Sequence, residues 1–395
     1  MGDDDVKRLI EIALGLAMAW ISVSAASAYA ADDRRPTALT LAVYGDSPYG
    51  TSPTDTAQLV ATPAFIDSIN ADRDVDLVMH VGDIHSGKQF CTQAYDQAVY
   101  DLWTRFAAPL VYTPGDNETT DCNKKAEGGG AYDPATQQID YVLDADGNPV
   151  DYAKGDPVAN LDLIRSIFFP HPGFTLGSHK RFVLSQSLAY DRRYPSDAKF
   201  AENVLWSDAG VLFVTIDLPG GSNNDTDVWY GAPTETPAQT RARAERTGAD
   251  LRWLDLAFGL AKLSRARAVV IGAQADMWDP EKGAAHQAGY EPFVQNVAFH
   301  AADFGRPVLM FNGDSHVYRS DDPLSSTAPC AWELAAECTS VAYIHPGYEV
   351  PNFHRVVVHG STFPLEWLKL TVDPSADGDG PTAFGPFRWE REIQP

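Results

Sequence analysis

The sequence predicts an α/β fold in which two β-sheets are flanked by helices. Strand-like and helix-like segments alternate between residues 39 and 113, as in parallel strands that are joined by helices. Apolar runs end four times in the dipeptide Gly-Asp, at Asp46, Asp83, Asp116 and Asp314. A chain of 395 residues is also long enough to bury a large core. Together these features indicate one large domain with polar loops at the strand ends.

The elements follow from hydrophobic periodicity and from flanking turn residues. Strands are expected at 39–44, 76–81, 109–113, 211–218, 268–271 and 307–311, and helices at 56–71, 93–106, 161–169 and 241–263. Residues 355–359 and 367–372 are expected to be closing strands of a second sheet. The Gly- and Asp-rich stretch 123–156 shows little periodicity, which predicts a loop insertion.

The four Gly-Asp pairs predict a metal centre. Because Gly tolerates positive φ, a strand that stops at Gly can turn sharply and place the next residue in the loop at its carboxyl end. Loops at this position carry active sites in α/β sheets. Four carboxylates gathered there would repel one another and resist ionisation unless cations neutralised them. We therefore expect Asp46, Asp83, Asp116 and Asp314 to surround one or two divalent ions.

Charge and missing motifs exclude several classes of function. The formal net charge of −24 argues against nucleic acid or an anionic membrane surface as a partner. The sequence contains no G-x-S-x-G elbow, P-loop or dinucleotide fingerprint. A glycosidase that uses two carboxylates as acid and base stays open as an alternative and needs no metal. We expect a monomer.

The amino terminus resembles an export signal. Lys7 and Arg8 precede the apolar stretch 12–23, and Ala28-Tyr29-Ala30 fits a cleavage site before Ala31. The acidic run 3–5 is atypical, so an uncleaved anchor is the alternative. We expect a signal peptide over 1–30, a polar lead-in over 31–37, one domain over 38–395, and a periplasmic or extracellular protein that has no other contact with the membrane.

The four cysteines lie beyond the expected cleavage site, which suits an oxidising compartment and allows three pairings. We favour Cys91 with Cys122, because each follows a Gly-Asp loop closely, and Cys330 with Cys338. Four separate buried thiols are the alternative. A cysteine zinc site is disfavoured, because no spacing resembles paired C-x-x-C.

The order of the polar loops resembles the calcineurin-like metallophosphoesterase superfamily, which includes purple acid phosphatases. That family presents, in order, D-x-H, G-D, G-N-H-E/D, a His after a strand, and G-H-x-H. The corresponding loops here are Gly45-Asp46-Ser47-Pro48, Gly82-Asp83-Ile84-His85, Gly115-Asp116-Asn117-Glu118, 272–276 (GAQAD) and Gly313-Asp314-Ser315-His316. The resemblance covers most of residues 38–375 and implies a metallophosphoesterase-like sandwich of two mixed β-sheets flanked by helices.

The resemblance implies that Asp46, Asp83 and His316 are metal ligands and that Asp83 is shared by two ions. Pro48 stands where the family has a His, and its side chain cannot coordinate a metal. The remaining ligand positions are oxygen donors, since Asn, His and His of the family are replaced by Asp116, Gln274 and Asp314. An oxygen-rich set favours Mn²⁺, Mg²⁺ or Ca²⁺ over the Zn²⁺ or Fe that imidazole clusters suit.

The implied reaction is hydrolysis of a small phosphate ester by a metal-bound hydroxide. Asn117 replaces a catalytic His of the family, and an amide cannot donate a proton and recover it near neutral pH. His85 is our candidate for the missing acid. Candidates for contacts to the substrate are Arg319 and Lys88, as phosphate-binding cations, and Asn223 and Asn224, as neutral hydrogen-bond donors.

A non-catalytic exported protein that holds a metal or ligand on the same fold is the second hypothesis. The changes at Pro48 and Asn117 support it. The retained polarity of nearly every substituted loop position favours the enzyme, because a relaxed site would drift toward apolar or small residues.

Overall fold

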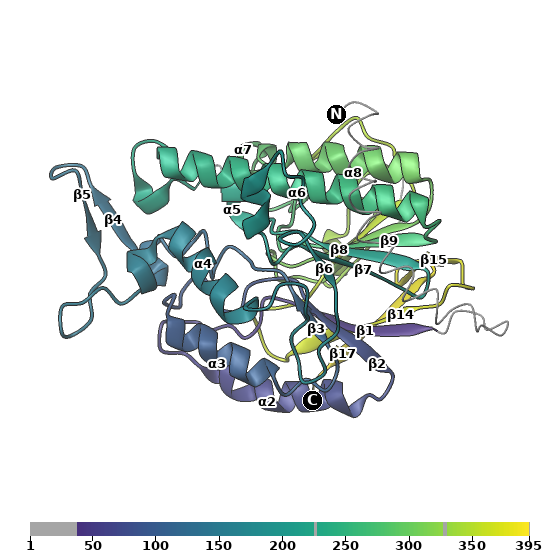
Figure 1. Cartoon of the computed structure of the whole chain (residues 1–395), viewed down its shortest axis with the longest axis horizontal. Coiled ribbons are helices and arrows are strands. Elements are labelled where there is room, and N and C mark those ends of the chain that lie inside the picture. The colour runs from purple at the N-terminus through teal and green to yellow at the C-terminus, as the bar shows by residue number, and fades with distance from the viewer. Residues whose placement is uncertain (1–37, 225–226, 327–329, 395) are drawn as a thin grey trace.

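The computed structural model describes residues 38–394 except 225–226 and 327–329, and the predicted signal segment therefore lies outside the described residues. Two large β-sheets pack face to face, and helices cover both outer faces (Figure 1). The seven-stranded sheet has the order β15 (Gly378–Gly380), β16 (Ala383–Gly385), β17 (Phe387–Ile393), β14 (Glu366–Val372), β1 (Leu39–Tyr44), β2 (Val75–His80) and β3 (Leu110–Tyr112).

The eight-stranded sheet has the order β12 (Ala331–Trp332), β11 (Arg319–Asp321), β13 (Phe353–Val357), β10 (Val308–Asn312), β9 (Ala268–Gly272), β8 (Val211–Thr215), β7 (Val204–Asp208) and β6 (Leu184–Ser185). Strands β1, β2 and β3 run parallel, as do β8, β9, β10 and β13. The carboxyl ends of these strands carry the Gly-Asp loops.

Three apolar clusters fill the space between the layers of sheets and helices. Leu41, Met79, Val270 and Phe311 belong to the cluster between the two sheets. The helices on the seven-stranded sheet are α2 (Ala57–Ala71), α3 (Gln93–Trp103) and α4 (Pro157–Phe168), and those on the other sheet are α6 (Pro237–Leu263) and α8 (Glu291–Phe304). The short elements are α5 (Gly220–Asn224), α7 (Ala284–Ala288), η1 (Lys125–Glu127), η2 (Tyr152–Gly155), η3 (Pro195–Lys199), η4 (Trp229–Gly231) and η5 (Ala335–Glu337). The predicted two-sheet α/β fold is confirmed.

Local sequence explains where the long helices begin. Pro237 occupies the first turn of α6, and the Thr236 side chain accepts a hydrogen bond from the backbone N–H of Gln239. Asp156 and Pro157 open α4 in the same way. Helix α8 ends at Phe304 and is followed by Gly305, whose φ of 65° is the left-handed conformation that ends many helices.

Two sequence predictions about the sheets need correction. Residues 355–359 and 367–372 were expected to close one sheet together, but β13 pairs with β10 whereas β14 pairs with β1 in the other sheet. Both segments have strand-like composition, but a local pattern does not identify the partner of a strand. The predicted insertion also contains a hairpin, β4 (Gly130–Asp133) and β5 (Gln138–Tyr141), which projects away from the sheets (Figure 1).

Both favoured disulfide pairings are present, Cys91–Cys122 and Cys330–Cys338. The first joins the segment after Asp83 to the segment after Asp116, at a Cα–Cα distance of 5.7 Å. In the part of the chain that the structure describes, no helix has the length and apolar character needed to cross a bilayer.

Candidate functional site

The loops that follow β1, β2, β3 and β10 meet at one end of the sandwich. Backbone hydrogen bonds join them directly, from Asp46 N–H to Gly82 O (2.9 Å) and from Ser47 N–H to Asp83 O (3.1 Å). The backbone N–H of Asp314 donates to Asp46 Oδ1 at 3.0 Å. These contacts fix the loops against one another before any ligand is considered.

The centre of this region is formed by Asp46, Asp83 and His316. Each offers a ligand atom, and these atoms all lie within 4.8 Å of one another. Both carboxylates are buried, and His316 Nε2 lies 3.4 Å from Asp46 Oδ1. Asp46, Asp83 and His316 have positive φ values of 49°, 61° and 63°. Such conformations are rare for residues other than Gly and occur often at functional sites.

Tyr49 lies among these side chains and was not singled out from the sequence. Its hydroxyl donates to Asp83 Oδ2 at 2.6 Å, accepts from Asn117 Nδ2 at 2.8 Å and lies 3.3 Å from His316 Nε2. It follows Pro48, the position where the family's His is absent. The only clue in the sequence was the position of Tyr49 in the first Gly-Asp loop. A single aromatic residue in a loop belongs to no motif that would mark it as part of a site.

Replacing Tyr49 by Phe should lower kcat/KM for a phosphate ester by about 10- to 100-fold, because Asp83 loses a partner that orients it. The ring is buried, and Phe keeps its shape, so the melting temperature should change little. Steady-state kinetics and thermal unfolding check this. An unchanged kcat/KM would contradict a positioning role for the Tyr49 hydroxyl.

A second group of polar side chains adjoins the first. Gln274 Nε2 donates to Asp83 Oδ2 at 3.2 Å and to Asp116 Oδ1 at 3.0 Å. The Gln274 oxygen, which the sequence analysis assigned to a metal, instead accepts from the backbone N–H of Gly220. Gln274 therefore acts here as a hydrogen-bond donor between two carboxylates.

The glycines of this region act mainly by leaving space for carboxylates. A Cβ on Gly115 would lie 1.8 Å from Asp83 Oδ1, and one on Gly313 would lie 2.3 Å from Asp46 Oδ2. A Cβ on Gly220 would lie 2.3 Å from Asp116 Oδ2 and 2.9 Å from Asp314 Oδ1. Among the Gly-Asp glycines the expected positive φ occurs at Gly82. In the first and last loops the positive φ falls on Asp46 and Asp314, and in the third loop neither Gly115 nor Asp116 has one.

Replacing Gly115 by Ala should lower kcat/KM by about a hundredfold, because the new methyl group would displace the Asp83 carboxylate. The matched control is Gly259→Ala in α6, where an added Cβ meets no atom within 4 Å. That control should keep full activity and raise the free energy of unfolding by about 0.5–1 kcal/mol. Equal activity of the two variants would show that close packing on Gly115 does not matter.

The carboxylates are poorly stabilised as anions. Burial raises the pKa of Asp46 to about 8, and burial also raises the pKa of Asp83, Asp116 and Asp314. Repulsion by neighbouring carboxylates is a further cause, from Asp116 on the other three and from Glu118 on Asp116. Asp46 Oδ2 has no hydrogen-bond partner among the described residues. A divalent cation would satisfy this oxygen and offset the repulsion, so the residues present fit a metal centre.

The stability of the metal-free protein should fall as pH rises from about 4 to about 8. Asp46 keeps its proton in the fold up to about pH 8 but loses it near pH 4 when unfolded, so the folded state binds more protons in this window. The loss is about 1.4 kcal/mol per pH unit for each carboxyl that behaves this way. Urea unfolding at pH 5 and pH 8, with chelator or with Mn²⁺, checks it. Mn²⁺ should remove the decline, and a decline that Mn²⁺ does not change would argue against a metal at this cluster.

The structure shows the surroundings of three predicted substrate contacts, Asn223, Asn224 and Lys88. Asn223 donates to Thr247 Oγ1 at 2.8 Å, and the Asn224 oxygen accepts from Trp229 Nε1 at 3.3 Å. Both asparagines are buried in the left-handed turn α5, so they hold this turn against its neighbours. Lys88 is exposed on the loop after Asp83.

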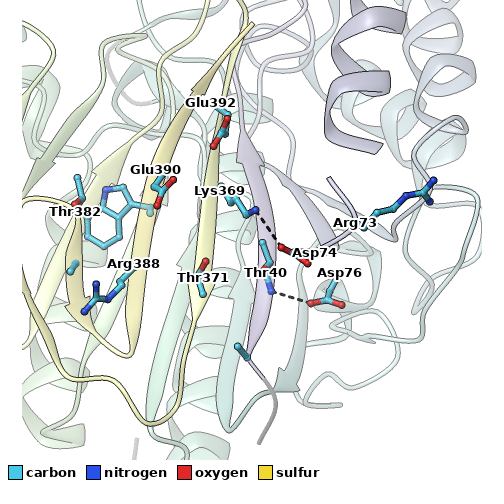
Figure 2. A pocket seen from close by; sticks show the side chains of 13 residues that line it. Thr40, Arg73, Asp74, Asp76, Lys369, Thr371, Thr382, Arg388, Glu390 and Glu392 are labelled. Carbon is cyan, nitrogen blue, oxygen red and sulfur yellow. Dashed lines mark hydrogen bonds and ion pairs between the residues drawn. The ribbon is translucent and has the colours of Figure 1, made fainter. Parts of the chain in front are cut away.

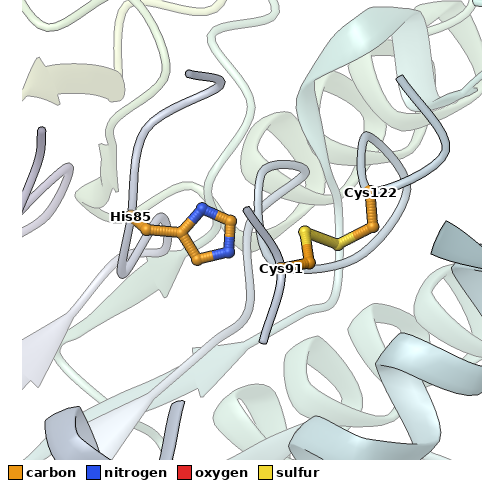
Figure 3. Close-up of side chains that lie close together, drawn as sticks. All are labelled: His85, Cys91 and Cys122. Carbon is orange, nitrogen blue, oxygen red and sulfur yellow. A yellow bond between two sulfur atoms is a disulfide. The ribbon is translucent and has the colours of Figure 1, made fainter. Parts of the chain in front are cut away.

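Arg319 and His85 also have surroundings that differ from the predicted roles. Arg319 is 2 % exposed and lies within 3.5 Å of carboxylates of Asp276 and Asp279. Its guanidinium is engaged by these carboxylates, so we do not assign it to a phosphate. His85 is buried, and its ring points toward the Cys91–Cys122 disulfide (Figure 3). Asn117 has the central place instead, since its Nδ2 donates to Asp83 Oδ2 at 3.1 Å.

A polar groove of about 770 Å³ opens elsewhere, on the outer face of the seven-stranded sheet (Figure 2). Thr40, Lys369 and Arg388 line it, and Lys369 forms ion pairs with Asp72 and Asp74. Thr40 lies near the start of β1, whereas Asp46 follows the end of this strand. We therefore place the chemistry at the Gly-Asp loops and not in this groove.

Comparison with known proteins identifies the family. The model of the calcineurin-like phosphoesterase family matches residues 39–254. A search of curated proteins finds no match. Among solved structures, a purple acid phosphatase from yellow lupin (Lupinus luteus) seeds, PPD1, is similar at 14% identity and a TM-score of 0.40. The match covers 91% of this chain and 52% of that one, so this chain spans about half the length of the lupin chain. The family model covers more than half of the sequence and includes the first three Gly-Asp loops, and the chain therefore belongs to the calcineurin-like phosphoesterase family.

Proposed function

We propose that this protein hydrolyses phosphate esters of small molecules at a divalent-metal centre held by Asp46, Asp83 and His316. The observation that carries the proposal is the convergence of their ligand atoms within 4.8 Å, with an unpartnered carboxylate oxygen among them. Membership of the calcineurin-like phosphoesterase family supports both phosphoester hydrolysis and the use of divalent metal.

The neighbouring residues would hold the ligands in place. Tyr49, Asn117 and Gln274 all donate to Asp83 Oδ2, which fixes the orientation of that carboxylate. Asp116 and Asp314 extend the acidic surface beside Gly220 and would hold a second ion. A cation bound here would lower the pKa of water and offset charge that develops on the phosphoryl oxygens. The predominance of oxygen donors favours Mn²⁺, Mg²⁺ or Ca²⁺.

Proton delivery to the leaving group limits the substrates. Asn117 is an amide and cannot act as a general acid, and the His85 ring is turned toward the disulfide. We therefore expect esters whose leaving groups depart without protonation to react fastest. An aryl phosphate should be hydrolysed faster than an alkyl phosphate of similar size.

The test is hydrolysis of aryl phosphate monoesters and diesters by protein that has been stripped of metal and supplied separately with Mn²⁺, Mg²⁺, Ca²⁺ or Zn²⁺. Metal-restored turnover supports the proposal and names the metal. A rise in melting temperature with metal, without turnover of any ester, would favour instead a binding protein on this fold.

We propose further that the protein is exported. The apolar stretch 12–23, the Ala28-Tyr29-Ala30 sequence and the two disulfides support this. Amino-terminal sequencing of protein recovered outside the cytoplasm should give Ala31 as the first residue. Recovery of full-length chain from the cytoplasm alone would contradict export.

A further inference from the structure

A second group of metal-ligating side chain types lies outside the carboxylate cluster. His85, Cys91 and Cys122 offer ligand atoms that all lie within 4.8 Å of one another, and Figure 3 shows the imidazole facing the disulfide. All three side chains are buried, with exposed fractions of 0%, 1% and 0%. The thiolate, and not a disulfide sulfur, is the metal ligand, so this group can bind a cation through its sulfurs only after reduction.

The imidazole of His85 is already arranged as a ligand. Its Nδ1 lies 3.2 Å from the backbone oxygen of Ser86, which can only accept, so Nδ1 carries the hydrogen. The lone pair then belongs to Nε2, which is buried and has no hydrogen-bond partner within the described chain. Metal-ligating histidines have the same arrangement, in which one ring N–H donates to a carbonyl and the other nitrogen binds the ion.

The surroundings of the two sulfurs supply further parts of a site. The Cα atoms of Cys91 and Cys122 are 5.7 Å apart, so both side chains reach the same point. The Asn117 carbonyl oxygen lies 3.2 Å from Cys91 Sγ and 3.4 Å from Cys122 Sγ. Two thiolates and one imidazole are three ligands of the kind that Zn²⁺ takes, and water can fill the fourth position.

We propose that reduction of the Cys91–Cys122 disulfide by a dithiol creates a site for a soft divalent cation such as Zn²⁺, formed by both thiolates and His85 Nε2. The dithiol supplies two electrons and two protons, the sulfur–sulfur bond of the protein breaks, and the reductant becomes a disulfide. Binding of the cation then releases the two thiol protons. Zn²⁺ would hold together the two loop segments that the disulfide joins in the oxidised protein.

This site would differ from the carboxylate cluster in the metal it selects. Sulfur and imidazole donors favour Zn²⁺ and Co²⁺, whereas carboxylates favour Mn²⁺, Mg²⁺ or Ca²⁺. The two sites are linked through Asn117, whose backbone oxygen contacts the sulfurs and whose side chain donates to Asp83. The oxidised protein retains the carboxylate cluster and is therefore the appropriate blank.

The test uses Co²⁺ as a spectroscopic substitute for Zn²⁺. Full-length protein carrying Cys330→Ser and Cys338→Ser keeps only the relevant cysteine pair. It is reduced with dithiothreitol, freed of reductant without air and titrated with Co²⁺, in parallel with its oxidised form. Reduced protein should bind one more Co²⁺ per chain than oxidised protein, with thiolate-to-cobalt charge-transfer absorption that Zn²⁺ abolishes. His85→Ala should weaken this binding by more than about tenfold. Loss of a residue that only orients a metal ligand already weakens binding by about this factor, and His85 would be a ligand itself.

Three results would overturn the proposal. These are Co²⁺ spectra that do not differ between oxidised and reduced protein, an affinity that His85→Ala leaves unchanged, and loss of the folded circular dichroism spectrum on reduction alone. The last result counts against the site because its ligands come from two loops that only the fold brings together.

Discussion

Replacing Asp83 by Asn is expected to lower the turnover of phosphate esters about a thousandfold, which corresponds to about 4 kcal/mol of transition-state stabilisation. Asp83 lies at the centre of the cluster and receives hydrogen bonds from Tyr49, Asn117 and Gln274. Its carboxylate charge is the feature that a cation requires, and Asn removes this charge while keeping the size of the side chain. Steady-state kinetics with saturating Mn²⁺ measure the effect.

Asp83→Asn should not lower the stability of the metal-free protein, although it lowers turnover. Burial and the repulsion of Asp116 and Asp46 raise the pKa of Asp83, so its ionised form destabilises the metal-free fold. Asp83→Asn should therefore be at least as stable as wild type in chelator but should lose the rise in melting temperature that metal produces. Asp67→Asn, on an exposed side chain, is the control and should behave as wild type. Wild-type turnover in Asp83→Asn would exclude the cluster as the catalytic centre.

Replacing Arg355 by Leu should lower the free energy of unfolding by about 3–5 kcal/mol, because buried Asp321 loses its paired cation and Asp276 keeps only Arg319. Arg355 is fully buried, donates to Asp321 through Nε (2.9 Å) and Nη2 (2.7 Å), and pairs with Asp276 through Nη1. Asp276 in turn donates its backbone N–H to Asp314 Oδ2 at 3.0 Å. The loss of Arg355 should therefore also weaken metal binding at the Gly-Asp loops.

Urea unfolding and a metal titration measure these two effects. Arg105→Leu is the control, since its pair with Asp67 is exposed and should contribute less than about 1 kcal/mol. Arg355→Lys keeps the charge but not the planar guanidinium group. Its loss of unfolding free energy should therefore lie between those of Arg355→Leu and Arg105→Leu. A loss below about 1 kcal/mol for Arg355→Leu would show that the network is not important for stability.

The positions of the strands near the Gly-Asp loops were predictable because local sequence decides them. Each of these strands is a short apolar run followed closely by Gly, and the connecting helix α3 has clear periodicity. The pairing of β13 and β14 was not predictable, because it depends on which sheet edge is free when the chain returns. Local patterns contain no information on that point.

The candidate site was also predictable only in part. Asp46, Asp83 and His316 come together as the loop motifs indicated. Tyr49 was missed, because its role depends on where the first loop places the ring relative to Asp83. Asn223 was predicted to contact the substrate because it lies in a polar loop after a strand, and in the structure it donates a hydrogen bond to Thr247.

Charged residues were the least predictable part. Arg319 follows the last loop closely enough to suggest phosphate binding, but the fold surrounds it with carboxylates of Asp276 and Asp279. Arg319 and these partners are about 40 residues apart in sequence, and a charge does not reveal its partner over that separation.

The most direct test of the central claim is to count bound divalent ions by native mass spectrometry in the same samples whose aryl phosphate turnover is measured. We expect turnover to rise in proportion to occupancy, to saturate at one or two ions per chain, and to be lost together with the ions in Asp83→Asn. Ions that bind at the same stoichiometry without turnover, or turnover that persists in metal-free protein, would contradict the assignment of this cluster as a phosphoesterase centre.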